Sequence, residues 1–463
     1  MTNFFLIRIG IVIFFFFIQN YNAFSESKQK PNILLIITDQ QTAMAMSNTG
    51  NPYCTTPAMD RLAANGIRFS RAYAVQPLCM PFRTSLQTGK YPHETGITAN
   101  TGKGNPNYTL LGKAMSDAGY DVAYHGKWHV AYKGSKNYET FNGDMNDAGV
   151  ADRAVSFLET DRKIPFFLTA SFLNPHDICQ LARSLANMPN NRLPSGPIPP
   201  FPSVDELPPL PANFNIPNNE PGVIREFQGM DGGKHFPVQE YDETTWRQYL
   251  WGYYRMVEKV DREILKVLDA LHNTNQEKNT VVIFISDHGD GISAHQWNEK
   301  KVLYNESVHI PCVISYMGVS PAGVVDSLHL VSPALDIFPT LLDFTNTAIP
   351  SHFTGKSLKP LILGENVPFW RTYVAVETML AENGKEMGNG RMIQTLNYKY
   401  VVYNNKDGAL NGEQFFDVKN DPGEMNNLAV DNNYITKINL YKNMLKNWQK
   451  KTGDENFTVP DTK

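Results

Sequence analysis

The chain has 463 residues, of which 42% are hydrophobic and 19% are charged, and its formal net charge is −4 at pH 7. This length predicts one large domain with an appendage or two to three domains, and the composition is that of an ordinary globular protein. The slight acidic excess argues against a nucleic-acid-binding protein, although a locally basic pocket for an anion remains open.

Residues 1–25 are typical of a signal peptide. Arg8 lies in an apolar stretch, residues 9–18 form its hydrophobic centre, and polar residues followed by Ala23 come before the expected cleavage site. The apolar run is too short for a comfortable membrane span, which favours a cleaved signal over a stable membrane anchor. We therefore expect an exported protein, either periplasmic or secreted.

Export would place four cysteines, Cys54, Cys79, Cys179 and Cys312, in an oxidising compartment. Four cysteines allow three pairings, and the sequence does not choose among them. Their spacing is not that of a metal-binding knuckle.

The first element after the signal is a strand over residues 33–38, whose unbroken apolar run predicts burial on both faces in a parallel sheet. Asp39 and Gln40 follow it directly. Polar residues at the carboxyl end of such a strand lie where α/β folds bind ligands; alternatively, Asp39 only caps the next helix. A helix over 56–66 and a short strand over 67–73 come next.

A helix is predicted to begin at Cys79, because Pro81 suits its first turn, and to end at Gly89. Cys79 and Arg83 then lie one turn apart on the same face. A reactive group at Cys79 would face outward from the positive end of the helix dipole beside a guanidinium, which suits an anion such as sulfate or phosphate. The alternative is a buried structural cysteine.

Polar residues also follow the next two predicted strands. The strand over 120–124 leads to Lys127 and His129, and the buried strand over 165–172 leads to His176. A lone histidine in a loop is more often only solvated. The repeated position after buried strands favours a functional edge of the sheet.

Residues 188–240 are rich in Pro, Gly and Asn and predict a long irregular insertion over the sheet. Loops of this length are uncommon unless functional, so the insertion could shape a substrate cleft; a surface loop without that role is an equal alternative. Arg225, Lys234 and His235 within it could contact a sugar carboxylate or a second sulfate, or could simply be solvated.

The second half continues with regular elements, in the order helix 241–271, strand 280–286, strand 308–314 and helix 333–342. The strand over 280–286 is again a buried apolar run. It ends in Asp287 and His288, and Lys300 follows downstream.

After residue 368 the pattern changes to short strands separated by turns, namely 372–377, 391–396, 399–403 and 414–418, with a final amphipathic helix over 433–449. We therefore predict an α/β fold with a large, mostly parallel central sheet flanked by helices. It forms a catalytic domain over 30–368, followed by a C-terminal subdomain over 369–463 with a small antiparallel sheet and one helix.

Asp39 and Asp287 would meet at one edge of a parallel sheet. With Gln40 and His288 they could hold one divalent cation, and the oxygen ligands favour Ca²⁺ or Mg²⁺. The same edge would receive a group of basic residues, Arg83, Lys127, His129, His176 and Lys300. A metal beside so many cations indicates an oxyanion substrate whose charge must be neutralised before attack.

With these motifs in place, the sequence resembles the type I sulfatases of the alkaline phosphatase superfamily over nearly the whole mature chain. The resemblance rests on motifs in the family's order: Cys-x-Pro-x-Arg at 79–83 with Thr-Gly-Lys-Tyr-Pro at 88–92, Gly-Tyr at 119–120 with Gly-Lys-Trp-His at 126–129, Ser-Asp-His-Gly at 286–289, the spacing between Lys300 and Tyr304, and the segment 416–428. One such motif alone would be weak evidence.

The resemblance implies that a formylglycine-generating or anaerobic maturation enzyme oxidises Cys79 to 3-oxoalanine (formylglycine). The hydrated aldehyde would attack sulfur and then expel sulfate, which divides one hard displacement into two easier steps. The resemblance also implies Ca²⁺, with Mg²⁺ or Mn²⁺ as alternatives, bound by residue 79 together with Asp39, Gln40, Asp287 and His288. Gln40 stands where many members carry a second Asp.

By the same resemblance, Arg83 and Lys127 hold the diol and the sulfate, and His129 is the base of the elimination step. His176 and Lys300 contact the sulfate and protonate the leaving oxygen. The leading hypothesis is thus an exported sulfatase acting on a sulfated polysaccharide or oligosaccharide. The alternatives are a phosphonate monoester or phosphodiester hydrolase of the same superfamily and a catalytically silent carbohydrate-binding relative.

Overall fold

The computed structural model describes residues 30–104, 107–189, 191–233 and 236–462. The predicted signal peptide, and Lys234 and His235 of the insertion, lie outside the described residues.

An eight-stranded sheet, in the order β4-β3-β5-β1-β6-β7-β2-β8, forms the centre of the molecule. Its middle strands are β1 (Asn32–Asp39), β5 (Phe166–Pro175) and β6 (Thr280–Ser286), and every residue in them is buried. β1 pairs in parallel with both neighbours. The outer strands are β3 (Asp121–Gly126), β4 (Thr140–Asn142), β2 (Ile67–Phe69), β7 (Cys312–Tyr316) and β8 (Val324–Asp326).

β7 is the exception to the parallel pattern, because it runs antiparallel to both β6 and β2. The predicted mostly parallel sheet is therefore confirmed, with one reversed strand. The strand expected over 308–314 begins only at Cys312, because the short helix α9 (Asn305–Val308) comes first and Pro311 cannot donate to a strand ladder.

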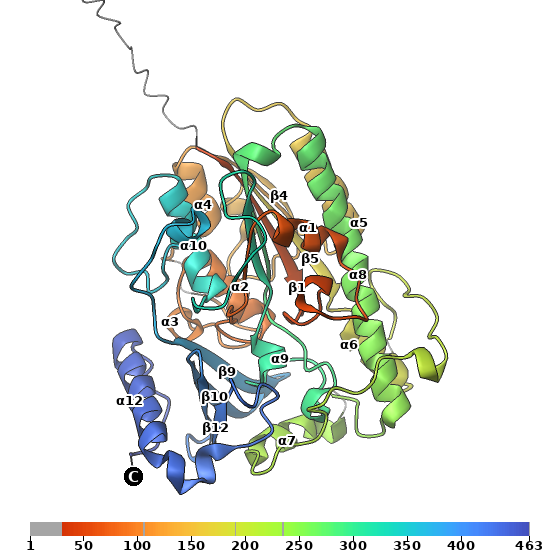
Figure 1. Ribbon diagram of the computed structural model, residues 1–463, viewed down its shortest axis with the longest axis vertical. Coiled ribbons are helices and arrows are strands. Elements are labelled where there is room, and N and C mark those ends of the chain that lie inside the picture. Colours follow the sequence, from red (N-terminus) through yellow and green to blue (C-terminus); the bar gives the residue numbers. More distant parts are fainter. Residues whose placement is uncertain (1–29, 105–106, 190, 234–235, 463) are drawn as a thin grey trace, which may run out of the picture. The chain divides into compact units, whose positions relative to one another are not determined.

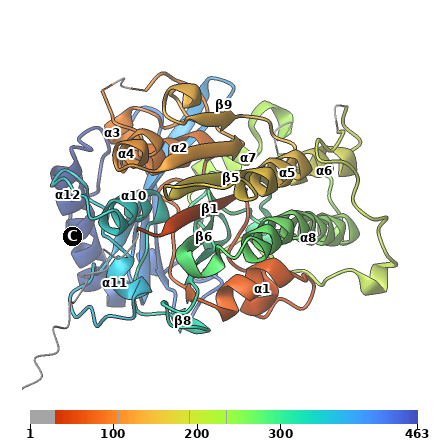
Figure 2. The ribbon, with the colours of Figure 1, turned by 90° about the horizontal axis from the view of Figure 1, so that it is seen from above.

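Helices cover both faces of this sheet (Figures 1 and 2). One face carries α1 (Pro57–Ala64), α5 (Asp147–Leu158), α6 (Ile178–Leu185) and the long helix α8 (Glu243–Asn273); the other carries α2 (Cys79–Thr88), α4 (Leu111–Asp117) and α10 (Pro333–Phe344). Successive residues of β1 serve the two cores in turn, since Leu34 packs with the α8 side and Leu35 with the α2 side. The short helices α3 (Pro92–Thr95) and α11 (Lys359–Ile362) lie in connections.

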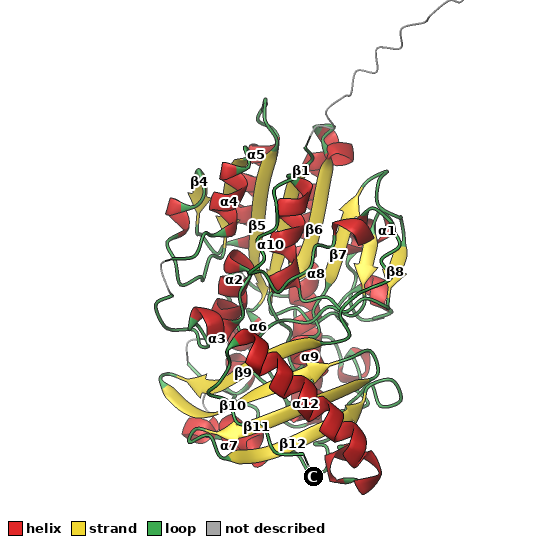
Figure 3. Ribbon diagram, turned by 90° about the vertical axis from the view of Figure 1, so that its left-hand side faces the viewer, coloured by secondary structure: helices red, strands yellow, loops and turns green. Residues whose placement is uncertain are grey.

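A second, four-stranded antiparallel sheet follows, in the order β12-β11-β10-β9. Its strands are β9 (Val374–Glu382), β10 (Lys385–Gln394), β11 (Tyr398–Asn405) and β12 (Leu410–Asp417), and α12 (Ile435–Thr452) lies across one face (Figure 3). The predicted small sheet with one helix is confirmed. The domain boundary at residue 368 remains a prediction.

The insertion over 188–240 is less irregular than expected, because it contains the helix α7 (Gly222–Gln228). Val223, Ile224 and Phe227 of α7 are buried in a core with residues of β9, β10 and β11. α7 thus covers the face of the small sheet that α12 leaves open. A helix of two turns that folds against a distant sheet gives little periodicity in its own sequence.

The four cysteines all lie in the described part of the chain, and each is a buried thiol outside any disulfide. No helix among the described residues combines the length and apolar character needed to cross a membrane.

Candidate active site

The candidate site lies at the carboxyl ends of β1 and β6, next to the start of α2. Asp39 is the last residue of β1 and Asp287 follows β6, and both side chains are fully buried. Thr38 and Ser286 are register partners in the parallel pair. This register brings the carboxylates of Asp39 and Asp287 together, although their strands are far apart in the sequence.

Arg83 joins the two carboxylates. Its Nη2 lies 3.0 Å from an Asp39 oxygen and its Nε lies 2.8 Å from an Asp287 oxygen. Its Nη1 donates to the Lys127 carbonyl and to the Ser171 hydroxyl, each at 2.8 Å. These contacts engage all three nitrogens of the guanidinium, which fixes its plane.

Cys79 opens α2 and is almost fully buried at the centre of this group. Its sulfur lies 3.1 Å from His288 Nε2 and 3.8 Å from the ammonium nitrogens of Lys127 and Lys300. Burial raises the pKa of the thiol, but Lys127 and Lys300, together with the neighbouring histidines, outweigh burial and hold this pKa well below its usual range. Negative charge at this position is therefore strongly stabilised.

Four side chains are placed to share a cation. Asp39, Cys79, Asp287 and His288 each offer one ligand atom, and these atoms all lie within 4.8 Å of one another. The Nδ1 of His288 donates to the Gly289 carbonyl at 2.9 Å, which leaves Nε2 to face the sulfur. Two carboxylates with one imidazole fit a divalent metal, and their oxygens favour Ca²⁺ or Mg²⁺.

Gln40 is a predicted metal ligand whose side-chain oxygen and nitrogen are both engaged in hydrogen bonds. Its Oε1 accepts from Lys300 Nζ at 2.6 Å, and its Nε2 donates to Asp290 at 2.8 Å. Its backbone N–H donates to Asp287, and its φ of 71° is left-handed. Metal binding by Gln40 therefore remains a prediction, while its contact with Lys300 is a property of the structure.

Lys127 and Lys300 supply positive charge from opposite parts of the chain. The Lys127 ammonium lies 2.6 Å from Asp39, and burial, which lowers its pKa, is outweighed by Asp39 and Cys79, so that the pKa is raised. The pKa of Lys300 is likewise raised, because Cys79 and its neighbours outweigh burial. Together with Arg83, three buried cations face two carboxylates around Cys79, a surplus that suits an oxyanion.

His129 and His176 stand beside Cys79, close enough for each to interact with its side chain. Burial and the field of Lys127 lower the pKa of His176 to about 4, so its imidazole is neutral at pH 7. Asp147 holds the segment that carries His176 by accepting the N–H groups of Leu173 at 2.6 Å and Asn174 at 3.1 Å.

The structure thus brings every predicted site residue to one edge of the sheet, and their individual roles remain predictions. The sequence analysis did not select Ser171, Asp147 or Asp290. Asp290 had a signal, since it directly follows the Ser-Asp-His-Gly motif. Ser171 and Asp147 had none, because their partners lie in other segments of the chain.

A pocket of about 650 Å³ opens beside this group. It is lined by Lys127, Trp128, His129, His176, Asp177, Gln180, Leu173, Pro194 and residues 143–146. Three of the predicted catalytic residues therefore form one wall of a space large enough for a sugar ring.

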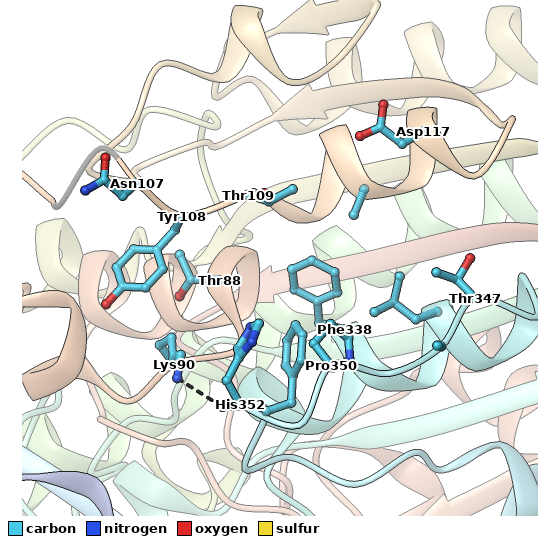
Figure 4. A pocket seen from close by; sticks show the side chains of 14 residues that line it. Thr88, Lys90, Asn107, Tyr108, Thr109, Asp117, Phe338, Thr347, Pro350 and His352 are labelled. Carbon is cyan, nitrogen blue, oxygen red and sulfur yellow. Dashed lines mark hydrogen bonds between the residues drawn. The ribbon is translucent and has the colours of Figure 1, made fainter.

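A second pocket, of about 520 Å³, lies at the other end of α2 (Figure 4). Its lining includes Thr88, Tyr108 and Phe338, and Lys90 donates there to the His352 carbonyl at 3.0 Å. Because α2 has ten residues, this pocket is about 15 Å along the helix from Cys79. The lining of this pocket contains no predicted site residue.

Comparisons with known proteins agree with this geometry. A family described as "Sulfatase" matches residues 31–347, and one described as "N-sulphoglucosamine sulphohydrolase, C-terminal" matches residues 293–451. A Delta 4,5-hexuronate-2-O-sulfatase of Bacteroides thetaiotaomicron is 31% identical over 460 residues, covering 94% of this chain and 92% of the relative. An N-acetylglucosamine-6-O-sulfatase of the same organism is 27% identical, covering 96% and 90%.

Solved structures show the same fold. A 2-O GAG sulfatase superposes with a TM-score of 0.82 at 28% identity, covering 94% of this chain and 95% of that chain. A phosphonate monoester hydrolase of Agrobacterium radiobacter superposes with a TM-score of 0.73 at 21% identity, covering 91% and 96%, which is a likeness of fold alone. The predicted alkaline phosphatase-like architecture is confirmed.

Proposed function

Because the chain belongs to the sulfatase family, we propose that it hydrolyses sulfate esters carried by a polysaccharide or oligosaccharide. The observation that carries the proposal is the environment of Cys79, whose sulfur lies within 4 Å of His288, Lys127 and Lys300. The names of two relatives, one for a hexuronate and one for N-acetylglucosamine, support a sugar substrate.

Cys79 is the encoded residue at the nucleophile position, and its sulfur marks the place of the oxygen that formylglycine would carry. The hydrated aldehyde would supply the nucleophile that attacks sulfur. Lys127 and Lys300 face that position with raised pKa values, so both are charged and can stabilise an oxyanion there. The buried positive charge of Arg83 adds to this stabilisation.

Protons are divided among three side chains in this proposal. His129 adjoins Cys79 and serves as the base that receives a proton when sulfate is released. His176, neutral at pH 7, donates a hydrogen bond through its N–H. Lys300, whose raised pKa keeps it protonated at pH 7, is the charged donor that faces the leaving oxygen.

A metal would be held by Asp39, Asp287, His288 and residue 79, with Gln40 as a further ligand if it turns from Lys300. Ca²⁺ is the proposed ion, and Mg²⁺ and Mn²⁺ are the alternatives. Bound there, it would add positive charge next to the nucleophile and the sulfate.

The test is production of the protein with and without a maturation enzyme, followed by mass spectrometry of the peptide that contains Cys79 and an assay of sulfate release. We expect the aldehyde and the activity to appear together. Full activity from protein that retains the free thiol would refute the mechanism.

The shared fold with phosphonate monoester hydrolases keeps one competing activity open. An aryl sulfate and the matching aryl phosphonate, assayed on the same preparation, separate the two. We expect a higher kcat/KM for the sulfate, and a higher value for the phosphonate would favour the alternative. Binding of sulfated glycan without turnover of either ester would identify a catalytically silent relative.

We also propose that the protein is exported to the periplasm or secreted, and that it meets its maturation enzyme on the way. The support is the sequence of residues 1–25, with its apolar centre and small residues after it. N-terminal sequencing of the mature protein tests this: a first residue near position 25 is expected, and a retained Met1 would contradict it.

A further inference from the structure

Part of the wall of the active-site pocket is built from the start of α6 and the residue before it. Asp177 and Gln180 both line the pocket, and Asp177 immediately follows His176. Ile178, Leu181 and Ala182 of the same helix are buried in the sheet core, which fixes the helix in place. The Ser195 N–H donates to Asp177 Oδ2 at 2.9 Å, so this carboxylate is held on one side.

The free atoms on this wall are acceptors. Asp177 Oδ1 and Gln180 Oε1 are both buried, and neither has a partner in hydrogen-bond geometry among the residues that the structure describes, although the Ser195 side chain lies near the Asp177 carboxylate. Leaving a buried polar atom without a partner costs about 1–3 kcal/mol, so a ligand that donates to it gains affinity. Sugar hydroxyls are donors of the right kind, whereas a carboxylate or a sulfate can only accept.

The charge of the lining points the same way. Asp144 and Asp177 are its carboxylates, and Lys127, already paired with Asp39, is the only Lys or Arg among the described lining residues. Arg183, on the same helix, does not line the pocket. Its positive charge acts to lower the pKa of Glu299. Asp144 is itself paired with Arg153 at 3.3 Å. A uronate carboxylate in this pocket would thus meet the negative charge of Asp177 and no free Lys or Arg of the described lining.

We propose that Asp177 and Gln180 determine substrate specificity by accepting hydrogen bonds from hydroxyls of the sugar that carries the sulfate ester. The preferred substrate class is then a sulfated sugar ring with uncharged hydroxyls beside the ester, and uronate rings are rejected. The inference rests on the proposed function, and it separates this chain from its hexuronate-named relative.

The experiment uses the matured full-length enzyme and three kinds of substrate. These are hexose sulfates with the ester at defined ring positions, the matching hexuronate sulfates, and an aryl sulfate that has no sugar hydroxyls. We expect the best hexose sulfate to exceed its hexuronate match in kcat/KM by at least about tenfold. Preference for the hexuronate, or turnover of the aryl sulfate with no sugar sulfate, overturns the inference.

Variants then test whether Asp177 and Gln180 cause the preference for hexose sulfates. Gln180→Leu removes the acceptor, and it should lower kcat/KM for the hexose sulfate at least about tenfold more than for the aryl sulfate. Asp177→Asn keeps an oxygen for the Ser195 N–H and removes the negative charge. It should therefore reduce the ratio of kcat/KM for the hexose sulfate to kcat/KM for the matching hexuronate sulfate. Equal losses on sugar and aryl substrates would show a merely structural role and overturn the inference.

Two controls complete the design. Ser184→Ala changes an exposed side chain on the same helix, and it should leave all ratios as in the wild type. Arg183→Gln should not alter the hexose to hexuronate ratio; a selective loss on the hexuronate would make Arg183 a carboxylate ligand and overturn the inference. If the wild type hydrolyses no sulfate ester at all, including the aryl sulfate, the proposed function itself has failed.

Discussion

The reaction centre around Cys79 and a second buried group, which we term the docking cluster, use similar side chains in different ways. The docking cluster consists of Asn213, His295, Glu306, Lys399 and Glu424, all buried. It joins the insertion, the loop after β6, α9 and the small C-terminal sheet.

The two groups differ in their balance of charge. In the docking cluster, Lys399 pairs with Glu424, and Asn213 donates to Glu306 at 2.9 Å. Burial and Lys399 lower the pKa of His295 to about 3, so one charged lysine faces two carboxyl groups. In the reaction centre, three cations face two carboxylates beside an open pocket. Buried charged residues alone therefore do not identify a catalytic site. The reaction centre is distinguished by its surplus of positive charge beside a pocket that can hold a ligand.

Among the changes that test this comparison, replacement of the nucleophile is expected to have the largest effect on activity. Cys79→Ala should lower sulfate release on the order of 10⁴-fold or more, because the covalent step is lost. Its folding should be preserved, since alanine fits the start of a helix. Cys312→Ala, in the buried strand β7, is the matched control and should keep its activity. Comparable losses in both variants would show that Cys79 is structural.

Removal of the metal is expected to have the second-largest effect on activity. Chelation should lower activity by at least about a hundredfold and lower the melting temperature, because an ion at a hundred times its Kd stabilises the folded state by about 2.7 kcal/mol. Added Ca²⁺ should restore both. Unchanged activity and melting temperature after exhaustive chelation would refute a metal at Asp39 and Asp287.

Breaking the docking cluster should affect stability rather than chemistry. Lys399→Met leaves Glu424 buried without its cation, and it should lower the free energy of unfolding by about 3–5 kcal/mol. Lys406→Met, on the exposed end of the small sheet, is the control and should have little effect. Denaturant unfolding measures both. A Lys399→Met protein of normal stability that has lost activity would place the cluster in the reaction.

The smallest expected effect concerns Glu306, whose pKa burial and Glu424 raise from 4.5 to about 7. Because the folded pKa is raised, the group favours folding below its unfolded pKa, and this contribution is lost as pH rises from about 4.5 to about 7. Glu306→Gln should therefore be more stable than the wild type at pH 8, by about 1–2 kcal/mol. Urea unfolding at pH 5 and pH 8 checks this, and an equal difference at both pH values would contradict it.

Much of the fold could be predicted because its signals are local. The strands that end in Asp39 and Asp287 are unbroken apolar runs, and α8 carries its apolar stripe over its whole length. The helix start at Cys79 follows from Pro81 and the stop at Gly89, whose φ of 67° is left-handed. These features depend on neighbouring residues only.

Other features could not be predicted, since they depend on contacts between remote segments. The reversal of β7 is set by its neighbours β6 and β2. α7 is short and is stabilised by burial against the small sheet. The contact of Gln40 with Lys300 joins residues 260 positions apart, and no local pattern in the sequence indicates it.

The sequence by itself determined which side chains follow the buried strands, and therefore which groups could react: a cysteine at a helix start, two carboxylates and a set of cations. Only the tertiary structure decided how they combine. It placed Arg83 between the two carboxylates, turned Gln40 toward Lys300, and set Asp177 and Gln180 on the pocket wall. The physical reason is that residue order fixes local backbone preferences, whereas side-chain partners depend on strand register and packing between segments hundreds of positions apart.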